Sequence, residues 1–301
     1  MTRRFLMAVT CAAVAGIAAA QSPTAAPSPA PAAAPAAPAS PQPAASPSPA
    51  APPYTPASPD PARGAELLKK AVAAHGGASA IDAIQRLELQ GSSGRVMPGQ
   101  DPIEMASHTH MVLPSLYRHE LVTNAGPIAT LLNRDGAFVI LSGGALPLPD
   151  AEAAALRATA NRNLMVLLRT RDAKDAPVSR VGTARLPEGE VEMIEFDQSG
   201  QKTVLAVDPK TGLVRQAIYA MPMAGAVSQV VATYSDYRAL SNGAKYPFQS
   251  VGTVDGKPVF SSRLTKIVVN GAIDDALFAL PAPPAAAEPL PWASPSPSSQ
   301  N

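Results

Sequence analysis

Short turn sequences separate the strand-like segments of this chain, and they constrain its fold more than any other feature. They combine Gly with Asn, Asp or Pro, which supply the backbone conformations that tight turns require. Such turns occur at residues 133–136, 198–200, 208–212, 242–243 and 255–256. Because turns this short join neighbouring antiparallel strands, the sequence predicts a β-meander.

About ten or eleven segments between residues 86 and 270 show the alternation and the β-branched or aromatic residues that are typical of strands. An open twisted sheet of that size tends to bend strongly or to close. We therefore expect an α+β, mainly β fold that is built on a single curved antiparallel sheet.

Two helices are expected before the sheet. Apolar residues recur at helical spacing within residues 62–75, namely Leu67, Leu68, Ala71 and Val72. His75 would lie in the last turn, where a partly charged imidazole suits the negative end of the helix dipole. Gly76 would supply the left-handed residue after the helix, and a second short helix is expected at residues 78–85.

A further helical segment interrupts the strands at residues 147–173, with Asp150 as its expected N-cap. Residues 164–168 of this segment form a nearly continuous apolar patch. A helix inserted within a curved sheet must cover part of that sheet, so we expect this segment to form a lid over its open mouth or its concave face.

The two ends of the chain differ in composition from the central part. Residues 1–20 combine Arg3 and Arg4 with an apolar run and three final alanines, the pattern of a cleavable signal peptide, and the remaining chain contains no apolar segment long enough for a transmembrane helix. Residues 21–61 and 281–301 are rich in Pro and Ala, which predicts a disordered linker and tail around a folded domain at residues 62–280. We therefore expect a periplasmic protein.

Composition and motifs argue against several classes of function. The chain carries 24 Lys and Arg against 23 Asp and Glu with no run of like charges, which argues against nucleic acid as a partner. The Gly-x-Ser-x-Gly and His-Glu-x-x-His motifs are absent, and the only cysteine, Cys11, lies in the expected signal peptide. We expect no enzyme activity and no cofactor.

Three histidines raise the remote alternative of a metal site. His108 and His110 lie on one face of their strand because side chains alternate along a strand. If residues 114 and 115 form the centre of a symmetric hairpin, His119 faces His110, and the three imidazoles share one patch that suits zinc or copper. A solvent-facing polar strand and a pH-sensitive patch are the other interpretations.

Several phrases, in this order, resemble the bacterial outer-membrane lipoprotein-sorting proteins, the LolA/LolB-like group. They are Ala74-His75-Gly76-Gly77, the turn from Val207 to Leu213, Tyr234-Ser235-Asp236-Tyr237 followed by Asn242-Gly243 and Tyr246-Pro247, and Val269-Asn270 followed by Asp275-Ala276-Leu277-Phe278. The resemblance implies an unclosed β-barrel with a helical lid over an apolar cavity. It also implies a lipid or lipoprotein acyl chain as the bound partner.

With this resemblance, the sequence predicts a cell-envelope protein that binds a hydrophobic ligand between sheet and lid. An envelope membrane protein is a further candidate partner. The candidate ligand-binding residues are Leu164, Met165, Leu167, Leu168, Met111, Met193 and Tyr237. The alternative for each of them is an ordinary place in the core. The alternative function is a tethered interaction or sensor domain with no exchangeable ligand.

Overall fold

The structure is a computed structural model that describes residues 54–96, 103–142, 144–172, 177–198, 200–223 and 226–281. The predicted signal peptide with Cys11, most of the predicted linker and nearly all of the predicted tail lie outside these residues. None of the described helices is long and apolar enough to cross a membrane.

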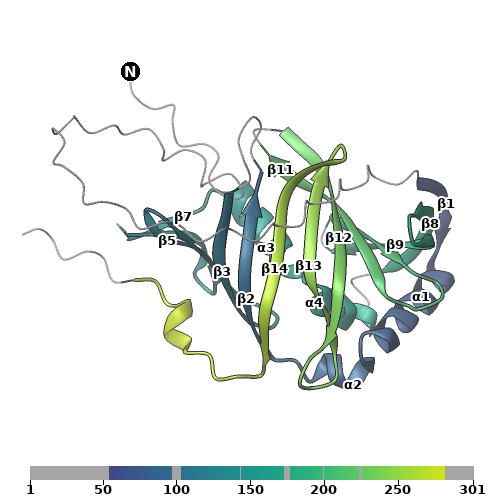
Figure 1. Cartoon of the computed structure of the whole chain (residues 1–301), viewed down its shortest axis with the longest axis horizontal. Coiled ribbons are helices and arrows are strands. Elements are labelled where there is room, and N and C mark those ends of the chain that lie inside the picture. The colour runs from purple at the N-terminus through teal and green to yellow at the C-terminus, as the bar shows by residue number, and fades with distance from the viewer. Residues whose placement is uncertain are drawn as a thin grey trace, which may run out of the picture.

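A single 14-stranded sheet with antiparallel neighbours dominates the described residues (Figure 1). Its strands are β1 (Tyr54–Asp60), β2 (Arg86–Arg95), β3 (Ile103–Val112), β4 (Leu116–Thr123), β5 (Gly126–Asn133), β6 (Gly136–Leu141), β7 (Gly144–Pro147), β8 (Val178–Leu186), β9 (Gly189–Gln198), β10 (Gln201–Val207), β11 (Val214–Met223), β12 (Ala226–Ala239), β13 (Lys245–Val254) and β14 (Lys257–Val269). The spatial order is β1-β8-β9-β10-β11-β12-β13-β14-β2-β3-β4-β5-β6-β7. Since β1 and β7 form unpaired edges among the described strands, the predicted curved, unclosed sheet is confirmed.

The structure adds three strands to the eleven segments that the sequence predicts, namely β1, β5 and β7. Strand β1 corrects the expected linker at its C-terminal end, because Tyr54–Asp60 pairs antiparallel with β8. Its prolines, Pro56 and Pro59, suggest a linker in the sequence, yet proline is tolerated in an edge strand, where one side of the backbone has no partner strand. The folded part of the chain therefore begins before residue 62.

Helix α1 (Pro61–Ala74) follows β1 directly and packs closely on the sheet. Asp60 caps its first turn by accepting a hydrogen bond from the backbone N–H of Arg63 at 2.9 Å. A Cβ atom on Gly64 would lie 2.7 Å from the backbone nitrogen of Arg180, so the helix approaches β8 more closely than a larger residue would allow.

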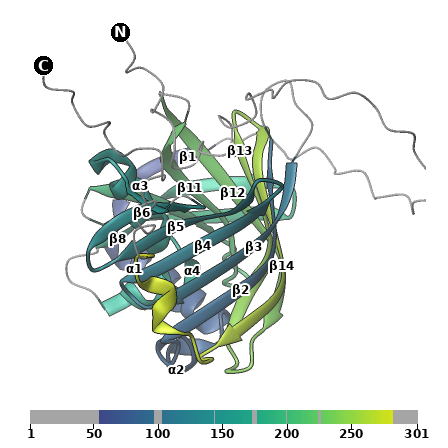
Figure 2. The same ribbon diagram turned by 90° about the vertical axis from the view of Figure 1, so that its left-hand side faces the viewer.

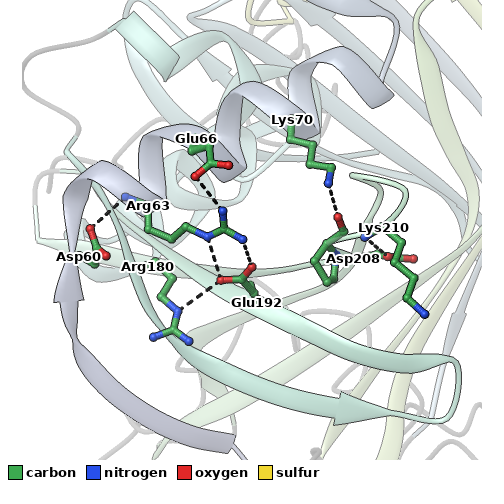
Figure 3. Close-up of polar contacts among 9 residues, drawn as sticks. Asp60, Arg63, Glu66, Lys70, Arg180, Glu192, Asp208 and Lys210 are labelled. Carbon is green, nitrogen blue, oxygen red and sulfur yellow. Dashed lines mark hydrogen bonds and ion pairs between the residues drawn. The ribbon is translucent and has the colours of Figure 1, made fainter.

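Ion pairs connect the exposed side of α1 to β8 and β9 (Figure 3). The Arg63 guanidinium donates hydrogen bonds to both Glu192 and Glu66, and Arg180 lies 3.5 Å from Glu192. The guanidinium of Arg63 holds the pKa of the Glu192 carboxyl below its usual range. Lys70 donates a hydrogen bond to the backbone carbonyl of Pro209 in the β10–β11 turn. These contacts fix α1 to β8, β9 and the β10–β11 turn.

His75 ends α1 as a buried, neutral group. Its exposed fraction is 0%, and its Nδ1 lies 2.8 Å from the backbone oxygen of Ala71. Burial lowers the pKa of His75 to about 4, and nearby Lys245 lowers it further. The expected partly charged imidazole is therefore wrong, whereas Gly76 has the predicted left-handed conformation with φ of 109°.

The helical segment in the middle of the chain is divided into separate helices. Helix α3 (Asp150–Asn161) and helix α4 (Leu164–Arg169) are followed by a short 3-10 helix, η1 (Thr170–Asp172). Pro149, not Asp150, occupies the N-cap position of α3. The division comes at Asn163, whose side-chain oxygen accepts a hydrogen bond from the backbone N–H of Met165 at 3.0 Å and so starts a new helix.

The largest core cluster lies where α1, α2 (Gly77–Asp82) and α4 pack against the concave face (Figures 1 and 2). Leu67, Ile81 and Leu168 come together there with Phe196 and Leu205 of the sheet. A second cluster joins α3 to β5 and β6. The 3-10 helix η2 (Asp275–Phe278) belongs to a smaller cluster with residues of β5 and β6. The helices on the concave face thus form two groups, and α3 packs on the sheet with only part of its length.

Candidate ligand-binding cavity

A cavity of about 330 Å³ lies between α3 and the concave face of the sheet. Residues of β2 to β6 and of β11 to β14 line it, and α3 with the α3–α4 junction forms its roof. Figure 2 shows α3 next to β5 and β6, near one edge of the sheet. The volume lies within the range of small-molecule binding sites, which is roughly 300–1,000 Å³.

One end of the cavity is mainly apolar, with Thr130 and Thr159 as its hydroxyl groups. Leu121, Ile128 and Val139 contribute side chains from β4, β5 and β6. Ala155 and Leu156 face them from α3. Leu156 is also part of the cluster that packs α3 on the sheet, so it serves both the core and the cavity wall. This end can bury hydrocarbon, whose transfer from water is favourable by roughly 25 cal/mol per Å².

The other end of the cavity is polar and continues into a smaller pocket of about 110 Å³. Hydroxyl and imidazole side chains line both spaces, namely Ser93, Thr109, His119, Ser250 and Ser262. Tyr234 and Tyr246 also border both. We refer to these seven residues as the polar floor. The whole site is thus amphipathic, with hydrocarbon contacts at one end and hydrogen-bonding groups at the other.

The histidine of the polar floor is neutral near neutral pH. His119 Nδ1 lies 2.8 Å from the Thr109 hydroxyl, and no described residue is a hydrogen-bond partner of its Nε2. Burial lowers the pKa of His119 to about 4, and the positive charge of Arg95 lowers it further, while Glu120 acts in the opposite direction. The ring can therefore offer Nε2 to a ligand in the cavity.

The position of His119 corrects the metal-site hypothesis. Val112 pairs with Leu116, so the hairpin loop has three residues and Thr109, not His110, stands opposite His119. A shift of one residue turns a side chain to the opposite face of the sheet. His119 therefore faces the cavity, while His108 and His110 lie on the other face. No three His, Cys, Asp or Glu side chains within the described part of the chain come together as a metal site.

The other two histidines form a separate polar group. Their ring centroids are 4.1 Å apart, and His108 Nε2 lies 2.9 Å from the Glu88 carboxylate. Burial lowers the pKa of His110, and the neighbouring His108 adds to this effect. Burial raises the pKa of the Glu88 carboxyl, but the hydrogen bonds that it accepts from Gln90 and His108 outweigh this effect and lower it. We therefore still interpret His108 and His110 as part of a polar strand face.

Polar groups of the α3–α4 junction complete the roof. The Arg162 guanidinium lies 4.1 Å from the centroid of the Tyr219 ring and donates a hydrogen bond to the Thr159 hydroxyl at 3.0 Å. The Asn163 side chain donates a hydrogen bond to the Tyr246 hydroxyl at 3.0 Å. Asn163 thus starts α4 and fastens the roof to β13 with the same side chain.

The tyrosines of the floor remain hydrogen-bond donors. Burial raises the pKa of Tyr246 to about 12, and it raises the pKa of Tyr234 well above its usual value. The neighbouring tyrosines raise the pKa of Tyr234 further, whereas Arg162 acts against them. Both phenols therefore keep their protons at neutral pH.

The structure separates the seven residues that the sequence predicts as ligand contacts. Met111 lines the cavity, where its sulfur accepts a hydrogen bond from Asn163. The other six do not line this cavity. Those of α4, namely Leu164, Met165, Leu167 and Leu168, are 0–3% exposed in the core with α1 and α2. Met193 packs in a separate cluster with Ala184 and Leu186, and Tyr237 packs edge-on against His75 and donates a hydrogen bond to the Val214 carbonyl.

From the sequence alone, an apolar patch such as that of α4 fits a buried core as well as a lid, and in the structure it packs in the core. The predicted set also omitted Ser93 and Arg95, which line the cavity. A signal for both was present, since they follow the buried residues Leu87 and Leu89 at even spacing and so share their face of β2. Two polar residues in the inward register of a strand are a sign of a cavity.

No protein-family model and no curated protein match this chain. Solved structures are similar to it, among them the following three. A LolA superfamily protein from Nitrosomonas europaea is 10% identical with a TM-score of 0.48, and the match covers 71% of this chain and 96% of that one. A putative outer membrane lipoprotein-sorting protein domain from Vibrio parahaemolyticus is 8% identical with a TM-score of 0.45, with coverage of 73% and 97%.

The third structure is a DUF1329 family protein from Desulfovibrio piger. It is 11% identical with a TM-score of 0.44, and the match covers 73% of this chain and 98% of that one. The names of the first two structures are those of the group that the sequence phrases resemble. The likeness concerns the fold, which for this chain rests on its own strand order and pairing.

Proposed function

We propose that this protein is a non-enzymatic binding protein of the cell envelope that holds an acyl chain, or another hydrophobic ligand with a polar end, between the curved sheet and α3. The cavity of about 330 Å³ under α3 carries this proposal. Its apolar end offers Leu121, Ile128, Val139 and Leu156 to hydrocarbon. Each buried methylene would contribute roughly 0.8 kcal/mol to binding.

The signal-peptide pattern of residues 1–20 supports export, so the proposed place of action is the periplasm. Helix α3 would act as the lid. It is joined to the sheet through β7 on one side, and it ends at the Arg162–Asn163 junction on the other. Movement of α3 away from β5 and β6 would open the apolar end, while the core around α4 keeps its structure.

Filling the cavity from its roof tests this proposal. Ala155 of α3 lines the cavity, whereas Ala151 of the same helix is exposed. We expect Ala155→Phe to abolish binding of a fluorescent fatty-acid probe to the mature protein, because the ring takes the space of the chain. Ala151→Phe, the matched control, should bind as the unchanged protein does. Equal binding by all three proteins, or no binding by any, would contradict the proposal, and the latter result would favour an interaction domain without an exchangeable ligand.

A further inference from the structure

The charged groups of the cavity are of one sign. Among the described residues that line the cavity and the smaller pocket, Arg95 and Arg162 are charged and none is Asp or Glu. A charge removed from water is costly unless another charge or a set of hydrogen bonds compensates it. A cationic side chain that lines the cavity without a carboxylate partner among the described residues, as Arg95 does, is therefore suited to an anion.

Arg95 carries most of this argument. It lies at the end of β2 and lines the cavity, and none of the carboxylates in the described part of the chain forms an ion pair with it. The nearest aromatic contact is Phe260, whose ring centroid lies 6.0 Å from the guanidinium carbon. This distance is at the limit of a cation–π contact. Burial is the main cause of the lowered pKa of His119, and the positive charge of Arg95 lowers it further.

The groups around Arg95 are suited to the oxygens of a small anion. The smaller pocket has a volume of about 110 Å³ and borders on hydroxyls of Ser93, Thr109, Ser250 and Ser262. The protonated hydroxyl of Tyr234 adds a donor, and His119 offers Nε2. Hydrogen bonds between such donors and a charged oxygen are shorter and stronger than those between neutral partners.

We propose that the polar floor, with Arg95 beside it, binds the anionic head group of an amphiphile, a carboxylate or a phosphate, whose hydrocarbon chain extends toward Leu121, Ile128 and Val139. This inference rests on the proposed function, because it gives the hydrophobic ligand a head group and an orientation. Arg162 adds positive charge from the roof, where it is stacked on Tyr219. The head group selects the ligand, and the chain contributes to affinity in proportion to its length.

The test compares ligands that share one hydrocarbon chain. Binding of dodecanoate, dodecyl phosphate, dodecanol and dodecyltrimethylammonium to the mature, delipidated protein is measured by titration calorimetry at neutral pH. We expect the tighter of the two anions to bind at least about tenfold more tightly than the ammonium compound, a difference of ~1.4 kcal/mol. The tighter anion also identifies the head group. Equal affinity for anion and cation would overturn the inference.

A substitution locates the head group in the cavity. Arg95→Gln should weaken the binding of dodecanoate about tenfold and leave the binding of dodecanol unchanged. Arg263→Gln is the control, because Arg263 is exposed on β14, next to the lining residue Ser262. The control should bind both ligands as the unchanged protein does. An equal loss for both ligands in Arg95→Gln would contradict the inference, since it would show a change of the whole cavity.

A second measurement does not depend on a variant. The NMR signals of the His119 ring report its pKa, which should be about 4 in the free protein and higher with dodecanoate bound, because an anion nearby favours the charged imidazole. Dodecanol should leave it unchanged. If dodecanol binds and dodecanoate leaves His119 unchanged, only the head-group inference fails. If none of the four compounds binds, both the head-group inference and the proposed function fail.

Discussion

Helices α3 and α4 follow one another in the chain and lie on the same sheet, yet one leaves a cavity and the other closes the core. Helix α4 contributes Leu164, Met165, Leu167 and Leu168, which are at most 3% exposed. Helix α3 has the sequence DAEAAALRATAN, in which Leu156 is the only large apolar side chain. Its alanines have little side-chain volume: Ala153 and Ala160 pack against β5 and β6, while a space remains at Ala155.

Side-chain volume, more than helix position, decides which part of the concave face can hold a ligand. Packed cores leave few voids larger than a water molecule. A space of about 330 Å³ under an alanine-rich helix is therefore the exception within this fold. This difference in packing would give the molecule a rigid half around α1 and α4. The half around α3 would be able to change its conformation.

Truncation of one leucine in each helix gives the largest expected difference. Leu168→Ala should lower the free energy of unfolding by about 2–5 kcal/mol, because it leaves a void in a tightly packed core. Leu156→Ala should lower the free energy of unfolding by less, because its neighbours already border on a cavity and α3 can shift toward the sheet. Urea denaturation measures both. An equal loss in the two variants would contradict the distinction between the halves.

A decrease in pH should lower the stability of the rigid half through protonation of His75 on unfolding. The folded protein holds the pKa of His75 at about 4, below the usual value of 6.5, so the unfolded chain binds more protons between these values. The stability that this group contributes is present above pH 6.5, falls as the pH decreases toward 4, and amounts to about 3 kcal/mol.

Denaturation by urea across this pH range measures the effect. His75→Gln should flatten the dependence on pH, because it removes the buried group that must be protonated on unfolding. The unchanged protein should keep its steeper dependence, to which His119 also contributes with its pKa of about 4. An identical slope in both proteins would show that His75 is not held neutral in the fold.

A substitution at the junction between α3 and α4 should lower the stability by a smaller amount. Asn163→Ala removes the cap of α4 and the hydrogen bond to Tyr246, and we expect it to lower stability by about 1 kcal/mol. Asn161→Ala is the control, since Asn161 is exposed at the end of α3. Thermal melts of both variants measure the difference. A loss in the control as large as in Asn163→Ala would count against the junction as the boundary between the halves.

Much of the fold could be predicted from local sequence signals. The Gly, Asn and Asp turns indicate antiparallel neighbours correctly, and Gly76 takes the left-handed conformation that its place after a helix suggests. Strand β1 could not be predicted in the same way. Its pairing with β8 depends on a segment more than a hundred residues away, and its prolines suggest a linker.

The candidate site was harder to predict, because it depends on register. A loop of three residues instead of two moved His119 from an outer patch to the cavity floor. The lining residues come from nine strands and one helix, so no local motif could contain them. The apolar patch of α4 was visible in the sequence, but its contacts with α1 and α2 are set by tertiary packing.

Native mass spectrometry of the mature protein, isolated gently from cells that export it, tests the central claim most directly. We predict a population whose mass exceeds that of the chain by one small amphiphile, and we predict its loss in Ala155→Phe but not in Ala151→Phe. The mass of the bare chain in all three proteins, together with no uptake of added dodecanoate, would contradict the claim that the space under α3 is a ligand site.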